Sequence, residues 1–422
     1  MRLHMPGHKG QGVLQERDIT EIEGADVLYH ARGIIAQSQQ NATRLFDTGK
    51  TVYSCEGSSL SVRAMLYLAR LWAAQRGGST KILAGRNAHK SFVSAAAMLD
   101  MEICWLYSES LLSCQITSEA LSAALQAEDE PPAAVYVTSP DYLGNQADIA
   151  ALSAVCRREN VLLLVDNAHG AYLRFLPQSA HPIVQGAHLC CDSAHKTLPV
   201  LTGGGYLHIA KDAPEMLFEQ AENAMALFAS TSPSYLILQS LDKANAYLEG
   251  GYREKLAAFI KEIAILRQRL TAHGFDLVGT EPLKLTLAPK SMGYRGEELA
   301  EMLLKRAIVS EFADADFVVL MLSPEQEECL LQLEQALLSI EKRPAVTEKP
   351  PLMPHPKRKL SPREALLCPS VLLPVEECEG RVLGALSVSC PPAVPVAVCG
   401  EVIDKELIKV MQYYGVNECY VI

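Results

Sequence analysis

The sequence of 422 residues has little of what a protein that binds nucleic acid, spans a membrane or is exported requires. Acidic residues outnumber basic ones, and the net charge of −11 argues against a nucleic-acid partner, which would need a basic face. No apolar run approaches the roughly 20 residues that span a bilayer. The N-terminus lacks the apolar core of a secretion signal. We therefore expect a cytoplasmic protein with no nucleic acid and no membrane as partner.

The 12 cysteines lack the spacing of a metal site. No two of them form a C-x-x-C pair; Cys190 and Cys191 are adjacent, and the others are scattered singly. Several lie in apolar settings, as Cys104 does beside Trp105, where a reduced cysteine packs as a small hydrophobe. We therefore predict no metal centre, and reduced thiols agree with the cytoplasm.

Residues 50–245 alternate short apolar runs with longer stretches of helical periodicity. This alternation predicts a parallel sheet that helices cover on both faces. The expected strands are Lys81–Ala84, Glu102–Leu106, Ala134–Thr138, Val161–Val165, His188–Asp192 and Gly205–Ile209. The expected helices between them are Leu60–Trp72, Ser91–Leu99, Ser118–Gln126 and Ile149–Arg158.

The pattern changes after this region. Two long helices are followed by a smaller α+β unit, a linker rich in proline and basic residues, and a last segment of short strands. The expected helices here are Pro233–Leu248, Glu254–His273, Glu297–Arg306, Pro324–Ile340 and Asp404–Tyr413. The expected strands of the smaller unit are Lys284–Leu287 and Phe317–Leu320, and the linker runs from Arg343 to Leu360.

A lysine and an aspartate each follow an apolar strand of the expected sheet. Lys196 lies in Asp192–Thr197, and Asp166 lies in Val165–Gly170. Open α/β sheets bind ligands at the carboxyl ends of their strands. A lysine there can bind a carbonyl compound covalently, and an acid can partner the protonated ring nitrogen of pyridoxal 5′-phosphate (PLP). Taken singly, Lys196 could be a surface lysine and Asp166 the cap of a turn.

Small polar residues could supply the other contacts of such a cofactor. Ser58 and Ser59 open a helical stretch, where backbone N–H groups favour a phosphate, and Ser193 could add a hydroxyl. His89 follows another strand and could stack on a planar ring. Serine-rich helix starts also occur without a phosphate, and His89 could be a helix residue with no ligand. Their convergence with the lysine and the aspartate on one sheet edge favours PLP.

Several motifs together resemble those of the Orn/Lys/Arg decarboxylase family, which are PLP enzymes of fold type I that decarboxylate basic amino acids. The similarity runs nearly from end to end of the chain. The matching segments are His4–Gly10, Asn87–Ser91, Asp166–Gly170, Ser193–Pro199, Ser230–Tyr235 and Leu360–Ala365. The combination is specific to the family.

The resemblance implies an α/β fold of the PLP-transferase type, like that of aspartate aminotransferase. A large domain with an N-terminal arm and a mostly parallel seven-stranded sheet would span residues 1–250. A linking helix and a small α+β domain would span residues 251–345. Residues 346–360 would form a linker, and residues 361–422 a C-terminal domain.

The resemblance also implies catalytic roles. Lys196 would hold PLP covalently, and Asp166 would contact its ring nitrogen. His89 would stack on the ring, and His195 would lie beside the lysine as a candidate acid. The further residues implied to hold the cofactor are Ser58, Ser59, His169 and Ser193.

Other implied contacts involve the substrate and a second subunit. Ser230, in the segment Ser230–Tyr235, would reach the cofactor of a partner copy, which implies a homodimer with shared active sites and leaves a higher oligomer open. Glu311 would face the distal cation of the substrate, and Tyr142 would lie at the rim of the site.

The sequence departs from the family pattern at four positions. Glu56 stands where asparagine is common, Asn167 replaces a glutamate, Asp141 replaces a threonine and Leu143 replaces an aromatic residue. We predict PLP-dependent decarboxylation of lysine, ornithine or arginine, with a role in amino acid and polyamine metabolism. The alternatives are another PLP reaction on the same fold, such as transamination, aldol cleavage or β-elimination, and a PLP-binding regulatory protein with little catalysis.

Overall fold

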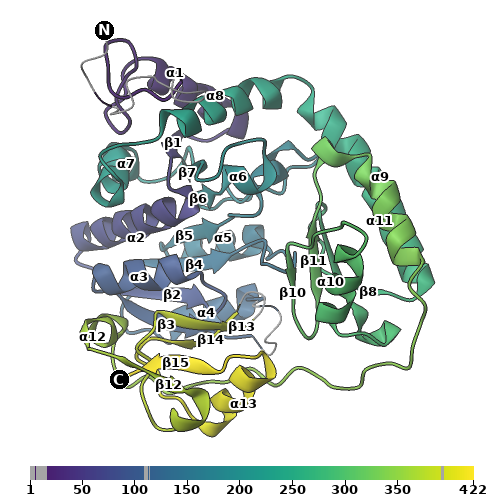
Figure 1. Cartoon of the computed structure of the whole chain (residues 1–422). Helices are drawn as coiled ribbons and strands as arrows, with labels where there is room; N and C mark the ends of the chain where they lie inside the picture. Colours follow the sequence, from purple (N-terminus) through teal and green to yellow (C-terminus); the bar gives the residue numbers. More distant parts are fainter. Residues whose placement is uncertain (1–4, 6–16, 109–112, 114, 391–393) are drawn as a thin grey trace.

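A seven-stranded sheet lies at the centre of the molecule, and two smaller units flank it (Figure 1). The computed structural model describes residues 5, 17–108, 113, 115–390 and 394–422. Across the sheet the strands follow the order β1-β7-β6-β5-β4-β2-β3. Their bounds are Lys50–Ser54 (β1), Lys81–Gly85 (β2), Glu102–Leu106 (β3), Ala134–Thr138 (β4), Leu162–Asp166 (β5), Leu189–Asp192 (β6) and Gly205–Ile209 (β7).

Helices cover both faces of this sheet because its central strands are apolar throughout. Along β5, Leu162 and Leu164 contribute to one core while Leu163 and Val165 contribute to the other. Helices α2, α3 and α7 pack together on the first face, and α4 and α5 cover the second. The helices of this region are Ile34–Phe46 (α1), Gly57–Gln75 (α2), Lys90–Met98 (α3), Ser118–Gln126 (α4), Ile149–Arg158 (α5), Ala194–Thr197 (α6), Glu215–Phe228 (α7) and Tyr235–Glu249 (α8), with a 3₁₀ turn at Ala171–Phe175.

The mostly parallel seven-stranded sheet that the resemblance implied is confirmed. Strands β2 to β6 pair in parallel, whereas β7 runs antiparallel to both β6 and β1. The sequence pattern did not identify β1, α1 or α7. Strand β1 has the sequence K-T-V-Y-S, whose polar residues hide its periodicity, and its full-length pairing with β7 stabilises it instead.

The smaller α+β unit contains an antiparallel sheet of order β10-β11-β9-β8, together with the long helix α9. Its elements are Tyr252–His273 (α9), Asp276–Val278 (β8), Lys284–Ala288 (β9), Gly296–Leu304 (α10), Phe312–Ala313 (β10), Val318–Met321 (β11) and Cys329–Leu338 (α11), with 3₁₀ turns at Pro289–Met292 and Pro324–Gln326.

The expectation of one helix over Pro324–Ile340 was wrong, because a 3₁₀ turn and α11 share this stretch. Ser323 Oγ accepts a hydrogen bond from the Glu325 N–H, and Lys255 of α9 pairs with the Glu325 carboxylate. These contacts hold the first turn apart from α11.

The C-terminal unit has its own apolar core and lies beside β3 and α3 (Figure 1, yellow). Two separate two-stranded sheets, β12 with β15 and β13 with β14, pack against α13. The elements are Pro362–Leu367 (α12), Val371–Pro374 (β12), Ser387–Cys390 (β13), Val394–Val398 (β14), Lys405–Tyr413 (α13) and Glu418–Val421 (β15), with a 3₁₀ turn at Val375–Glu377. Among the described residues, we find no helix with the length and apolar character needed to cross a membrane.

A buried ion pair ties the C-terminal unit to the large sheet. Arg86 follows β2 and is only 1% exposed, and both of its terminal nitrogens lie 2.7 Å from the Glu401 carboxylate oxygens. The same guanidinium donates to the carbonyl oxygens of Pro395 and Val396. Such two-point geometry gives direction as well as energy. The contact therefore fixes the loop after β2 against the start of β14.

We expect Glu401→Gln to destabilise the protein by about 3–5 kcal/mol, because it leaves the Arg86 charge buried and without its partner. The matched control is Glu102→Gln, which breaks the exposed pair between Arg358 and Glu102. That change should cost about 1 kcal/mol or less. The measurement is the midpoint of urea unfolding for the two variants and the wild type. Equal shifts would contradict the role given to the buried pair.

Candidate active site

A cavity of about 570 Å³ opens at the carboxyl edge of the large sheet. Segments that follow β1, β2, β4, β5 and β6 form its wall, because strands that run in one direction bring their carboxyl ends to one edge. Pro395 of the C-terminal unit also lines it. The predicted site residues that line this cavity are Ser58, Ser59, His89, Tyr142, Asp166, His169, Ser193, His195 and Lys196.

Lys196 lies in the single turn of α6, directly after β6. Its Nζ is 3.1 Å from His169 Nε2, and because an amine nitrogen with protons donates, the imidazole accepts at this atom. Burial lowers the pKa of Lys196, while the nearby carboxylate of Asp166 opposes the shift. Burial, followed by the charges of Lys284 and Lys196, holds the pKa of His169 well below its usual value. His169 is therefore a neutral imidazole that carries its proton on Nδ1.

Asp166 ends β5 and is 3% exposed. Its carboxylate accepts hydrogen bonds from Tyr136 Oη at 2.9 Å and from the Ala168 N–H at 3.1 Å. The Cys191 thiol lies 3.5 Å from the same carboxylate. Burial and the charge of Asp166 raise the pKa of Tyr136 well above its usual value, so this hydroxyl keeps its proton and remains a donor. The aspartate is thus held at the cavity wall by neutral donors.

The serine residues meet at the first turn of α2. Gly57, Ser58 and Ser59 begin the helix, where N–H groups have no partner within the helix itself. Ser193 Oγ donates to Ser58 Oγ across 2.8 Å, which joins the start of α2 to the turn after β6. His195 Nδ1 lies 2.9 Å from the Gly204 carbonyl oxygen, so it donates there. This corner of the cavity combines hydroxyl groups with the positive end of a 19-residue helix dipole.

His89 caps the N-terminus of α3 with its ring. His89 Nδ1 accepts from the Ser91 N–H at 3.2 Å and lies 2.8 Å from Ser91 Oγ. The neutral ring therefore carries its proton on Nε2. Burial lowers the pKa of His89, which favours this neutral form.

The residues predicted to contact the substrate or a second subunit lie at the rim or outside the cavity. Tyr142 lines it, and its hydroxyl donates to Glu311 Oε1 at 2.8 Å, although Glu311 itself does not line it. Ser230 does not line the cavity either; its backbone N–H donates to Glu56 Oε1 at 2.7 Å. Apart from Met5, the predicted N-terminal signature at residues 4–10 lies outside the described residues.

Sequence reasoning missed several groups near the site, including Tyr136, Cys191 and Lys284. Lys284 is 2% exposed, donates to the Asp141 carbonyl oxygen at 3.1 Å and lies 5.6 Å from the centre of the Tyr142 ring. Burial lowers its pKa. The signal was a charged residue inside the apolar strand L-K-L-T-L, since a charge in such a strand is costly unless it has partners.

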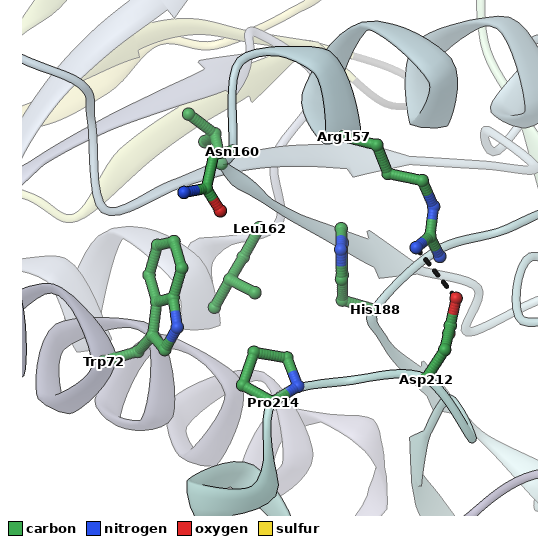
Figure 2. Close-up of a pocket in the computed structure, with 8 residues that line it drawn as sticks. Trp72, Arg157, Asn160, Leu162, His188, Asp212 and Pro214 are labelled. Atoms are coloured by element: carbon green, nitrogen blue, oxygen red, sulfur yellow. Dashed lines mark ion pairs between the residues drawn. The ribbon is translucent and has the colours of Figure 1, made fainter.

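A second cavity of about 310 Å³ lies at the opposite edge of the sheet (Figure 2). Its principal cation is Arg157, whose nitrogens already contact Ser153, the Gly186 carbonyl and the Asp212 carboxylate. His188 Nδ1 accepts from the Leu163 N–H. Because protein groups already hold the charged side chains here, the carboxyl edge is the better candidate for a ligand.

The strand order and the site at the carboxyl edge define a PLP-transferase-like fold. The structure superposes on a lysine decarboxylase, LdcF, of Francisella novicida with a TM-score of 0.81 and 17% identity, over 100% of this chain and 79% of that one. The sequence profile of the family described as "Orn/Lys/Arg decarboxylase, major domain" matches residues 5–281. The chain belongs to this family and is a decarboxylase, that is, a carboxy-lyase.

Two curated relatives are similar along nearly the whole chain. An arginine decarboxylase of Halalkalibacterium halodurans is 28% identical over 96% of this chain and 88% of its own length. An arginine decarboxylase of Bacillus subtilis is 28% identical over 96% of this chain and 89% of its own length. The similarity to these relatives therefore extends beyond the residues that the family profile matches.

We expect Tyr136→Phe to lower the free energy of unfolding by about 1–3 kcal/mol, because the buried Asp166 carboxylate would lose a donor. Tyr206→Phe is the matched control. Tyr206 is equally buried in the same sheet, and among the described residues its hydroxyl has no hydrogen-bond partner. Its removal should leave stability unchanged or raise it, because it takes away a buried hydroxyl that has no partner. Chemical denaturation of the protein without cofactor tests both, and a smaller loss for Tyr136→Phe than for the control would contradict the prediction.

Proposed function

We propose that this chain uses PLP to release CO₂ from a basic amino acid, with arginine as the first substrate to test. The observation that carries the proposal is the juxtaposition of Lys196, Asp166 and the first turn of α2 in one cavity. These are an amine, an acid and an anion-binding helix start, which are the three contacts that hold PLP by its aldehyde, ring nitrogen and phosphate.

The donor set of the cavity fits this cofactor. Ser58, Ser59 and Ser193 offer hydroxyl groups, and the first turn of α2 offers N–H groups, to a phosphate. His169 Nδ1 is buried, and among the described residues it has no hydrogen-bond partner. A buried donor of this kind is costly unless a ligand or water completes it. The unpaired nitrogen of His169 supports a polar ligand next to Lys196.

When bound, PLP withdraws electrons from the bond that breaks at the α-carbon of an amino acid. The chain supplies the setting for this chemistry. Burial favours the neutral, nucleophilic amine of Lys196, which would bind the cofactor covalently. Asp166 would hold a proton at the ring nitrogen, and the neutral ring of His89 would pack on the cofactor. His195 or Lys196 would then return a proton to the α-carbon after CO₂ leaves.

Glu311 and Tyr142 support a cationic substrate. The Tyr142 hydroxyl holds the Glu311 carboxylate at 2.8 Å, beside the rim of the cavity. A carboxylate there could pair with the guanidinium or ammonium group of a basic side chain. The names of the two curated relatives favour arginine among the three candidates.

We also propose a homodimer in which the segment Ser230–Tyr235 of one copy completes the site of the other. Ser230 is exposed and is bound to Glu56, which lines the rim of the cavity. A mass in solution of twice 46.0 kDa is the measurement that tests it.

Lys196→Ala should abolish both CO₂ release and the absorbance of lysine-bound PLP, because Lys196 is the amine beside His169 and close to Asp166. Lys90, the other lysine that lines the cavity among the described residues, begins α3. The control is Lys211→Ala, since Lys211 follows β7 and lies at the opposite edge of the sheet. It should keep both signals. Turnover by the Lys196→Ala variant with unchanged absorbance would refute the assignment.

Glu311→Gln should raise KM for arginine roughly tenfold or more with a smaller effect on kcat, because the lost charge binds the part of the substrate that does not react. Initial rates of CO₂ release with arginine, lysine and ornithine test the effect and rank the substrates. Detection of the keto acid in place of the amine would favour transamination. An unchanged KM for every substrate would exclude Glu311 as the cation contact.

A further inference from the structure

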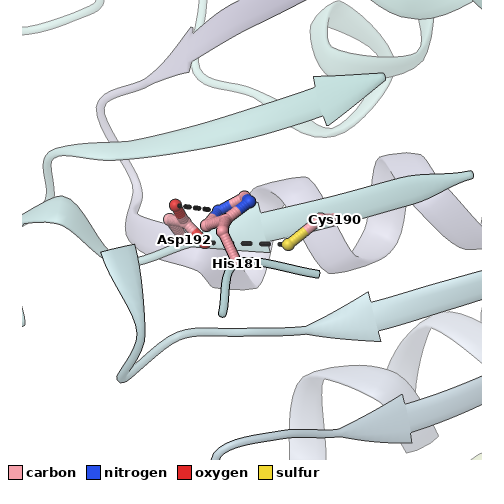
Figure 3. Close-up of side chains that lie close together, drawn as sticks. All are labelled: His181, Cys190 and Asp192. Carbon is pink, nitrogen blue, oxygen red and sulfur yellow. Dashed lines mark hydrogen bonds and ion pairs between the residues drawn. The ribbon is translucent and has the colours of Figure 1, made fainter. Parts of the chain in front are cut away.

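A buried polar cluster surrounds Asp192 at the carboxyl end of β6. His181 Nε2 and His208 Nε2 each lie 3.1 Å from Asp192 Oδ2, and Asn167 Nδ2 lies 2.7 Å from Asp192 Oδ1. Figure 3 shows His181 and Cys190 close to the aspartate, and the Cys190 thiol lies 3.7 Å from Asp192 Oδ1. Asp192, His181 and His208 are all 0% exposed. None of these residues lines the cavity described above, yet Asp192 directly precedes Ser193, which does.

The hydrogen bonds of the cluster are those of a proton-bridged network and not of a metal centre. The Ile183 N–H points at His181 Nδ1, 3.4 Å away, so Nδ1 accepts and Nε2 carries a proton. That proton faces Asp192, whereas a metal would need a lone pair at this atom. Thr51 Oγ1 lies 2.9 Å from His208 Nδ1 and can donate to it, which leaves His208 Nε2 as a second donor to the same carboxylate.

The charges agree with this arrangement. Burial alone would raise the pKa of Asp192, but His181 and His208 outweigh it and hold that pKa below its usual value. Burial lowers the pKa of His208, which favours its neutral form. Asp192 is therefore a buried anion whose oxygens accept from four side-chain donors, of which the Cys190 thiol is the most distant. Ionised carboxylates form stronger hydrogen bonds than neutral groups, so the network is rigid.

The bond between Asn167 and Asp192 joins the two turns that carry the cofactor residues. Strands β5 and β6 are neighbours, with Asp166 opposite Cys191, and the Asn167 N–H donates to the Cys191 carbonyl oxygen at 3.0 Å. The side-chain bond lies one residue beyond this last backbone contact. Asn167 directly follows Asp166, and Asp192 is four residues before Lys196.

We propose that Asp192 is a positioning residue, which acts through Asn167 to fix the turn after β5 relative to the turn after β6. Asp166 and His169 lie on the first turn and Ser193 and Lys196 on the second. That these residues hold PLP is part of the proposed function, on which this proposal rests. It also accounts for an amide at position 167, where the resemblance implies a glutamate. A second carboxylate there would face Asp192 at hydrogen-bond distance, with no proton between them.

The test compares four variants in the full-length protein: Asp192→Ala, Asn167→Ala, the double variant, and Asp192→Asn. Each is measured for PLP affinity, for the pH midpoint of the absorbance of bound PLP, and for the melting temperature without PLP. Both alanine variants should bind PLP roughly tenfold more weakly and shift the midpoint. The double variant should bind PLP no more weakly than the single variant of lower affinity, because both substitutions break the same hydrogen bond between Asn167 and Asp192. Asp192→Asn should recover most of the loss, since its amide can still pair with a reoriented Asn167.

Leu152→Ala serves as a control for destabilisation alone. Leu152 is fully buried on the other face of the sheet, so its loss lowers the melting temperature without touching either turn. The proposal is overturned if Asp192→Ala and Asn167→Ala behave as this control does, or if their effects on PLP affinity add. Should Asp192→Ala fail to fold, Asn167→Ala and Asp192→Asn still decide the matter. Absence of PLP binding by the wild type would instead refute the proposed function.

Discussion

Parallel pairing of β4, β5 and β6 is the constraint on which the site depends. The register sets Thr138 opposite Asp166, and Asp166 opposite Cys191, so that three strands end at nearly the same level. Backbone hydrogen bonds along the strands maintain this alignment. Residues separated by tens of positions in sequence therefore lie within a few ångströms at one edge. A slip of one residue in β5 would turn Asp166 away from the cavity.

A polar group that is buried at this edge destabilises the fold unless it has a hydrogen-bond partner. The partners present here explain which groups carry protons. The carboxylate of Asp166 has Tyr136 and a backbone N–H, and His169 accepts from Lys196. Histidines 89 and 169 both have pKa values lowered by burial. The result is a site in which neutral donors surround a buried acid, and a lysine of lowered pKa can act as a nucleophile.

How much could be predicted from the sequence follows from the range of each interaction. The strand ends at Asp166 and Lys196 were predictable because apolar runs and the residues after them are local in sequence. The contact of Arg86 with Glu401 joins residues 315 positions apart, and no periodicity reports it. The reversed direction of β7 was equally hidden, because a short strand has the same pattern in either direction. Tyr136 was missed for another reason: an aromatic residue in an apolar strand is expected to be part of the hydrophobic core, and not a hydrogen-bond donor to the site.

Two of the four departures from the family pattern, Asn167 and Asp141, have hydrogen-bond partners outside the cavity wall. Asn167 donates to Asp192, away from the predicted cofactor contacts. The Asp141 carboxylate accepts from the backbone N–H and the side-chain amide of Asn145, both at 2.8 Å. Burial raises the pKa of Asp141. The two Asn145 donors and the charge of nearby Lys284 oppose that shift, because they stabilise the ionised carboxylate. At both positions the substituted side chain forms its hydrogen bonds with a residue that does not line the cavity. The two substitutions therefore leave the polar groups that line the cavity unchanged.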